Sequence, residues 1–141
     1  MRITAVVMIL FLLPVGCATL AERSRREKFD LISKSFERAL RTSDYTEAAK
    51  YLDTPVGQAG PDLKHLRNYK ISDYKIVRIH VSEDKQQITQ DVELQYFRLN
   101  GTILHSTRYP QTWRYIPDRE IWLLATGLPD LGPQPPRPRR R

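Results

Sequence analysis

Cys17 is the side chain of this sequence whose type and position most directly suggest a covalent chemistry. It is the only cysteine among 141 residues, so it cannot form an internal disulfide. It follows Arg2 and an apolar run from Ile3 to Val15, which together have the anatomy of a secretory signal peptide. The run is shorter than the roughly 20 apolar residues that span a bilayer. We therefore expect residues 1–16 to be a signal peptide that exports the rest of the chain.

The sequence around this thiol resembles the bacterial lipobox, in which signal cleavage leaves a lipid-modified cysteine as the first residue. Gly16 and Cys17 match that pattern, whereas Pro14 stands where leucine is usual. The resemblance implies a diacylglyceryl group on the sulfur and acyl chains such as palmitate, which together hold a protein firmly to a bilayer. Ala18, in place of aspartate, implies the periplasmic face of the outer membrane. Ordinary cleavage near Ala18 or Ala21 and an uncleaved anchor are the alternatives.

Basic residues are concentrated near the two ends of the chain. The net charge is +7, and much of it belongs to the signal peptide and the C-terminal tail, so the middle is nearly balanced and does not favour nucleic-acid binding. Residues 129–141 are rich in proline and lack aromatic side chains, which predicts a disordered tail. Its arginines are candidates for contact with an anionic surface, and a functionally idle terminus is the alternative. They are Arg137, Arg139, Arg140 and Arg141.

The spacing of apolar residues predicts helices before residue 69 and strands after it. Apolar side chains recur at helical spacing from Thr19 to Arg41. Asp44 with Glu47 is a capping-box pattern that predicts a short second helix, and Pro61 is well placed to open a third helical turn. Alternating patterns then predict four antiparallel strands, over 71–81, 88–99, 102–116 with an interruption near Pro110, and 121–126. We predict an α+β fold with N-terminal helices packed on a curved four-stranded antiparallel sheet.

Turn geometry predicts which side chains share a face of this sheet. With Asn100-Gly101 as a two-residue turn, Tyr96 opposes His105 and Val92 opposes Tyr109, while the first turn would place Ile79 opposite Ile88. The helices should cover Ile71, Val77, Ile79, Ile88, Val92, Leu94, Tyr96, Ile103, Tyr109, Trp113, Tyr115, Trp122 and Leu124. The other face keeps a smaller apolar set, which we predict to be a partner surface because an apolar patch in water usually has a partner. This set is Phe97, Leu104 and Leu123.

Several of these segments resemble a known superfamily. Asp44-Tyr45-x-x-Ala48-x-x-x-Leu52, followed by Trp113-x-Tyr115 and Trp122-x-Leu124, resembles the cone-shaped α+β roll superfamily named after nuclear transport factor two. The resemblance covers roughly residues 25 to 127 and implies a cavity between helices and sheet. Members include isomerases, dehydratases, polyketide cyclases and non-enzymatic binding domains, so the fold does not specify a reaction. The predicted domain is 25–128, preceded by a tether over 17–24.

A cone cavity would be lined by aromatic and basic side chains of the sheet, and the candidates are Tyr96, Arg98, His105, Tyr109 and Trp113. His105 with Tyr96 could transfer protons. The nearest acidic residue on that face, Asp73, would lie two strand spacings away, about 10 Å, which is too far to orient the histidine. Trp113 could stack a ligand or, more simply, fill the core. We therefore assign no catalytic residue.

The remaining histidines give no metal site. His65, His80 and His105 are scattered without the spacing of zinc ligands, so neither a metal nor a cofactor is expected. We predict a lipid-anchored envelope protein that acts as a non-catalytic binding or assembly module. Its expected partners are the membrane, another envelope protein or a second copy of itself, and a small apolar ligand in the cone. The alternative is a small enzyme of isomerase, dehydratase or cyclase type that uses His105 and Tyr96.

Overall fold

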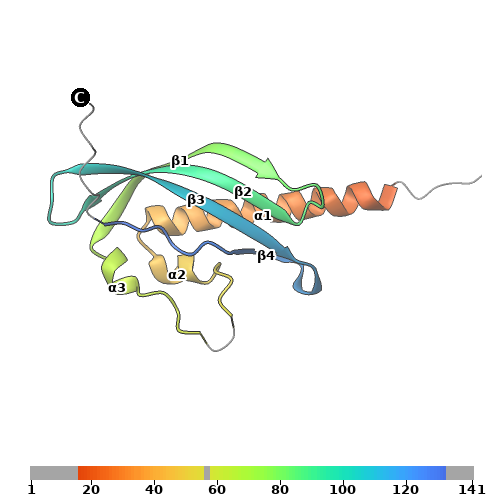
Figure 1. Ribbon diagram of the computed structural model, residues 1–141, viewed down its shortest axis with the longest axis horizontal. Helices are drawn as coiled ribbons and strands as arrows, with labels where there is room; N and C mark the ends of the chain where they lie inside the picture. The colour runs from red at the N-terminus through yellow and green to blue at the C-terminus, as the bar shows by residue number, and fades with distance from the viewer. Residues whose placement is uncertain (1–15, 56–57, 133–141) are drawn as a thin grey trace, which may run out of the picture.

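The fold is α+β, as the sequence predicts. The computed structural model describes residues 16–55 and 58–132, in which three helices precede four strands. The strands form one open antiparallel sheet in the order β1-β2-β3-β4, so each strand pairs with its neighbour in sequence. Figure 1 shows the long helix α1 running along the curved sheet, with the two short helices below it.

Helix α1 (Gly16–Arg41) begins three residues before the predicted start. Its buried side chains include Phe29, Phe36 and Leu40, which recur at helical spacing and face the sheet. The first turns, over residues 17–24, are exposed and extend beyond the sheet (Figure 1). The second half of the helix therefore makes the buried contacts with the rest of the domain.

The two short helices are each capped by an aspartate. In α2 (Tyr45–Ala49), the predicted cap Asp44 accepts a hydrogen bond from the backbone N–H of Glu47 at 3.0 Å. In α3 (Leu63–Leu66), the cap is Asp62, whose carboxylate accepts from the N–H of Lys64, so the helix starts after Pro61 rather than at it. Because these aspartates satisfy N–H groups that a helix leaves unpaired, very short helices persist here.

The pairing of the last three strands follows the prediction. Strand β2 (Gln87–Arg98) pairs with β3 (Leu104–Ile116) so that Tyr96 opposes His105, and β3 pairs with β4 (Ile121–Leu124). The predicted interruption at Pro110 is wrong, because β3 is continuous there. Strand β4 pairs only with Trp113–Ile116 of β3. Pro110 therefore has β2 on one side and no strand on the other, where the N–H that proline lacks would point, so no hydrogen bond between strands is lost.

Strand β1 (Tyr69–Val81) departs from the prediction because it contains two β-bulges. Register shifts leave Ser72 and Val77 as extra residues, and each shift reverses the faces of the residues that follow. At the turn, before either bulge is reached, Val81 pairs with Ile88, so the connection is shorter than predicted and Ile79 lies opposite Gln90 instead of Ile88. Asp73 opposes Gln95 and is exposed on the outer face, contrary to the predicted inner position.

Most of the predicted covered face is buried, with three clear exceptions. Val77 is 44% exposed at its bulge, Ile79 is 43% exposed on the edge strand, and Ile103 is 68% exposed in the loop before β3. The loop is wider than the predicted two-residue turn, because paired strands end at Arg98 and resume at Leu104. Side chains of this loop therefore face water.

The centre of the core is a cluster of aromatic rings between α1 and the sheet. The ring of Phe29 makes edge contacts with Trp113 and Trp122, at centroid distances of 5.9 and 5.3 Å. Phe36 makes a further edge contact with Trp113 at 5.4 Å. Edge-to-face geometry is the arrangement that aromatic quadrupoles favour, so these contacts add to the free energy of burial.

Replacing Phe29 with alanine should remove the ring that joins both tryptophans. We expect Phe29→Ala to lower the free energy of unfolding by about 3 to 5 kcal/mol, since a large cavity would remain between helix and sheet. Leu31→Ala, at a position on the same helix that is 69% exposed, is the control and should change stability by less than about 0.5 kcal/mol. Urea unfolding followed by circular dichroism measures both values. Equal losses for the two variants would contradict the packing described.

Candidate functional site

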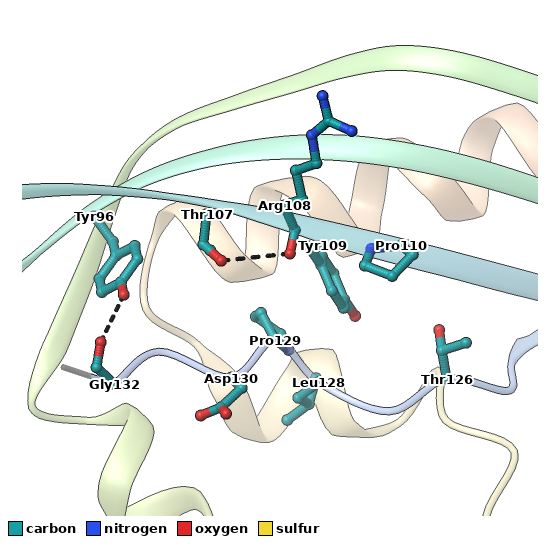
Figure 2. A pocket seen from close by; sticks show the side chains of 10 residues that line it. All are labelled: Tyr96, Thr107, Arg108, Tyr109, Pro110, Thr126, Leu128, Pro129, Asp130 and Gly132. Atoms are coloured by element: carbon teal, nitrogen blue, oxygen red, sulfur yellow. Dashed lines mark hydrogen bonds between the residues drawn. The ribbon is translucent and has the colours of Figure 1, made fainter. Parts of the chain in front are cut away.

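The inner face of the sheet, where a cone cavity was predicted, is crossed by the chain that follows β4. We call residues 125–132 the C-terminal strap. Side-chain donors of the domain bind its backbone at both ends: the Tyr109 hydroxyl donates to the Gly127 carbonyl at 2.6 Å, and the Tyr96 hydroxyl donates to the Gly132 carbonyl at 2.7 Å. Figure 2 shows both tyrosines directed at the strap.

Two further features hold the strap in place. Leu131 is fully buried, and its carbonyl lies 2.6 Å from Nε2 of His65. Gly127 has a φ of +77°, a backbone conformation that favours glycine, and it begins the turn away from β4. The predicted disordered tail therefore begins too early, because Pro129 to Gly132 pack against the domain. Its arginines, Arg137, Arg139, Arg140 and Arg141, lie outside the described residues.

A hollow of about 630 Å³ lies between β3 and the strap. Figure 2 shows that the guanidinium of Arg108 points away from the strap, whereas the tyrosine rings point towards it. The hollow is therefore lined mainly by aromatic, proline and small polar groups. Its lining residues are Tyr96, Thr107, Arg108, Tyr109, Pro110, Thr126, Leu128, Pro129, Asp130 and Gly132.

The five predicted pocket residues do not share one cavity. Tyr96 and Tyr109 line the hollow under the strap. Arg98 and His105 line a second hollow of about 360 Å³, together with residues of α3 and the start of β1. Trp113 is fully buried among the rings of α1 and lines neither hollow. The core reading of Trp113 thus agrees with the structure.

His105 lies beside Tyr96, as the predicted register requires. Its half-buried imidazole stacks on the Tyr96 ring, with centroids 5.3 Å apart and planes 26° from parallel. The described residues that line its hollow, His65, Asn68, Tyr69, Arg98 and His105 itself, include no carboxylate.

Two buried tyrosines of the inner face, Tyr74 and Tyr109, have a raised pKa. Burial raises the pKa of Tyr109 well above 10.0, and the nearby Tyr74 adds to the effect. Burial also raises the pKa of Tyr74, against the opposing effect of a 2.7 Å hydrogen bond from Gln111. Gln111 in turn accepts a bond from the indole N–H of Trp113 at 3.0 Å. Trp113, Gln111 and Tyr74 thus form a buried chain of hydrogen bonds, and Tyr109 is bonded separately to the strap.

The predicted partner surface is split between opposite ends of the sheet. Phe97 and Leu104 face each other at one end, whereas Leu123 opposes Arg114 at the other. Ten residues of β3 separate Leu104 from Arg114, which corresponds to about 33 Å along a strand. The three side chains therefore do not form one patch.

Sequence reasoning missed two residues that enlarge the Leu104 end. Leu99 and Ile103, which are 58% and 68% exposed, lie in the loop between β2 and β3, and Leu104, which is 57% exposed, begins β3. We call these three the hairpin-tip cluster. The prediction of a two-residue turn did not reveal this cluster, because such a turn places Leu99 and Ile103 within paired strands. The sequence signal was the presence of Leu99 directly before Asn100-Gly101 and of Ile103 two positions after it, close to a turn that is expected to be exposed.

Cys17 is exposed as a free thiol in the first turn of α1. Within residues 16–55 and 58–132, no helix is both long enough and apolar enough to cross a membrane. The same ranges contain no group of three histidine, cysteine or carboxylate side chains arranged to bind a metal ion. Comparison of the chain with models of protein families, with curated proteins and with solved structures finds no match.

The pKa of Tyr109 leads to a testable dependence of stability on pH. Because the folded pKa is raised, the contribution of Tyr109 is complete below pH 10 and is lost as the pH rises towards the folded value. Above about pH 10, Tyr109→Phe should make the fall in unfolding free energy shallower by about 1.4 kcal/mol per pH unit. Urea titrations of both proteins between pH 8 and 11 measure the difference, and parallel curves would contradict the buried, neutral hydroxyl.

Proposed function

We propose that this protein is a lipid-anchored module of a bacterial cell envelope that binds or assembles with another protein and performs no catalysis. The observation that carries the proposal is the position of two exposed features at opposite ends of the long axis of the molecule (Figure 1). Cys17 lies at one end, in the first turn of α1, and the hairpin-tip cluster lies near the other. A protein attached at the first end presents the second away from the membrane.

The anchor is supported by the sequence around Cys17 and by the helix that follows it. The apolar run and the Gly16-Cys17 pair resemble a lipoprotein signal, and residues 17–24 are exposed helix that extends beyond the sheet. A helix rises about 1.5 Å per residue, so these eight residues form a spacer of about 12 Å. Such a spacer would separate the domain from lipid head groups.

The proposal of a non-catalytic role is supported by the side chains that fill the interior. Rings of Phe29, Phe36 and Trp113 occupy the space between helix and sheet, where members of the cone-shaped roll superfamily would hold a ligand. The hydroxyl of Tyr96, which the enzyme alternative requires, donates to the strap instead. The proposed function therefore uses the outer surface.

The proposed contact surface is the hairpin-tip cluster. Its three aliphatic side chains are each more than half exposed, and they lie close together in sequence around one turn. Apolar side chains gathered on a surface in water commonly mark a site of protein contact. A second copy of the chain or another envelope protein would bury them.

The anchor is tested by the mass of the mature protein from the membrane fraction. We expect the wild-type chain to begin at Cys17 and to carry a diacylglyceryl group and acyl chains, and Cys17→Ser to lose all of them because serine offers no thiol. Ala21→Ser, in the same exposed stretch of helix, should keep the modification. Recovery of an intact Met1, or of an unmodified thiol, would exclude the lipid anchor.

The contact surface is tested by self-association of the full-length chain in a mild detergent. We expect Leu104→Glu to weaken association by at least about tenfold, since the carboxylate would be buried without a partner. Leu123→Glu, at the distant end of the sheet, is the matched control. Sedimentation velocity over a range of concentrations measures both. Identical behaviour of the two variants would count against assembly through the hairpin tip.

A further inference from the structure

The C-terminal strap lies in the domain as a bound peptide would. Three donors from three different elements meet its backbone: Tyr109 from β3, Tyr96 from β2 and His65 from α3. Because a carbonyl oxygen only accepts, Nε2 of His65 is the donor in the third bond. All three bonds reach main-chain carbonyls, which every peptide carries, so this part of the recognition is independent of sequence.

The side chains of the strap provide the contacts that depend on sequence: Pro129 is buried, Leu128 packs on the core, and Leu131 is the deepest of the three. Leu131 is fully buried, and the domain binds its own carbonyl and that of the next residue, Gly132. Full burial of a leucine contributes about 1.5 to 3 kcal/mol, which is more than a typical hydrogen bond contributes. The site thus selects an extended backbone with a leucine at one position.

The strap does not fill the groove that it occupies. The hollow of about 630 Å³ beneath it is bounded by Leu128, Pro129 and Asp130 on the strap and by Thr107 and Tyr109 on β3. Figure 2 shows the open space between these two sets of residues. A segment with larger side chains at the positions of Leu128 or Asp130 would contact more of the groove than the strap does.

We propose that this groove is a recognition site for an extended, leucine-bearing segment of a partner protein, which the chain's own strap occupies in its absence. The strap sequence, Gly127-Leu-Pro-Asp-Leu-Gly132, defines the chemistry: one leucine for the buried position, and small residues or proline where the backbone bends. The strap competes with the partner, so the apparent affinity falls with the fraction of molecules whose groove is open. The site is separate from the hairpin-tip cluster and does not depend on the lipid anchor.

The test uses a fluorescent peptide with the sequence of residues 125–132 and the full-length chain carrying Cys17→Ser, so that no lipid interferes. Two variants loosen the strap differently: Leu131→Ala removes its buried side chain, and Gly127→Val strains its backbone at positive φ. Fluorescence anisotropy should show each variant binding the peptide about tenfold or more tightly than the parent chain. The Gly127 variant retains every core side chain, so the test stands even if Leu131→Ala fails to fold.

Two controls distinguish recognition from non-specific adhesion. A peptide with alanine in place of its second leucine should bind at least about tenfold more weakly, and Tyr96→Phe combined with Gly127→Val should bind the original peptide more weakly than Gly127→Val alone. Equal binding of both peptides, or no gain in either loosened variant, would overturn the proposal. A dimer of the loosened chain that the peptide dissociates would overturn it too, because the groove would then belong to the strap of a second copy.

Discussion

The packing of the rings of Phe29 and Phe36 against Trp113 and Trp122 is the interaction on which the rest of this structure depends. With no disulfide available, burial of apolar area must offset the loss of chain entropy, and aromatic rings supply the largest area per residue. The rings join the middle of α1 to the two strands nearest the C-terminus. They also fill the space between α1 and the sheet, so one interaction both stabilises the domain and closes its centre.

The C-terminal strap covers a part of the sheet's inner face beside the aromatic cluster. Tyr96 and Tyr109 lie on the inner face and donate hydrogen bonds from their hydroxyls, and burial raises the pKa of Tyr109. Their hydrogen-bond partners are carbonyls of the strap, and the buried side chain of Leu131 adds an apolar contact. Two hydroxyls of the inner face thus hold a segment of the chain's own backbone. Among the described residues, the first turns of α1 and the hairpin tip are exposed, and hollows lie beside the strap and around His105.

Local patterns determine most of the fold but not all of the site. The capped helices, the four strands and the pairing of Tyr96 with His105 follow from apolar period, cap residues and turn signals in the sequence. The bulges at Ser72 and Val77 have no comparable signal, because an extra residue in a strand changes the faces without changing composition. The strap escaped prediction because its prolines and glycines suggest disorder, whereas its order comes from donors distant in sequence, at His65, Tyr96 and Tyr109.

The most direct test of a filled interior is the accessibility of Trp113 to a quencher dissolved in water. The chain has two tryptophans, so Trp122→Phe leaves Trp113 as the sole emitter while keeping an aromatic ring in the cluster. In the folded variant, acrylamide should quench the emission only weakly, because Trp113 is fully buried among the rings of α1. Unfolding in urea should restore strong quenching. Equally strong quenching in the folded and unfolded chains would show an open cavity and contradict this account.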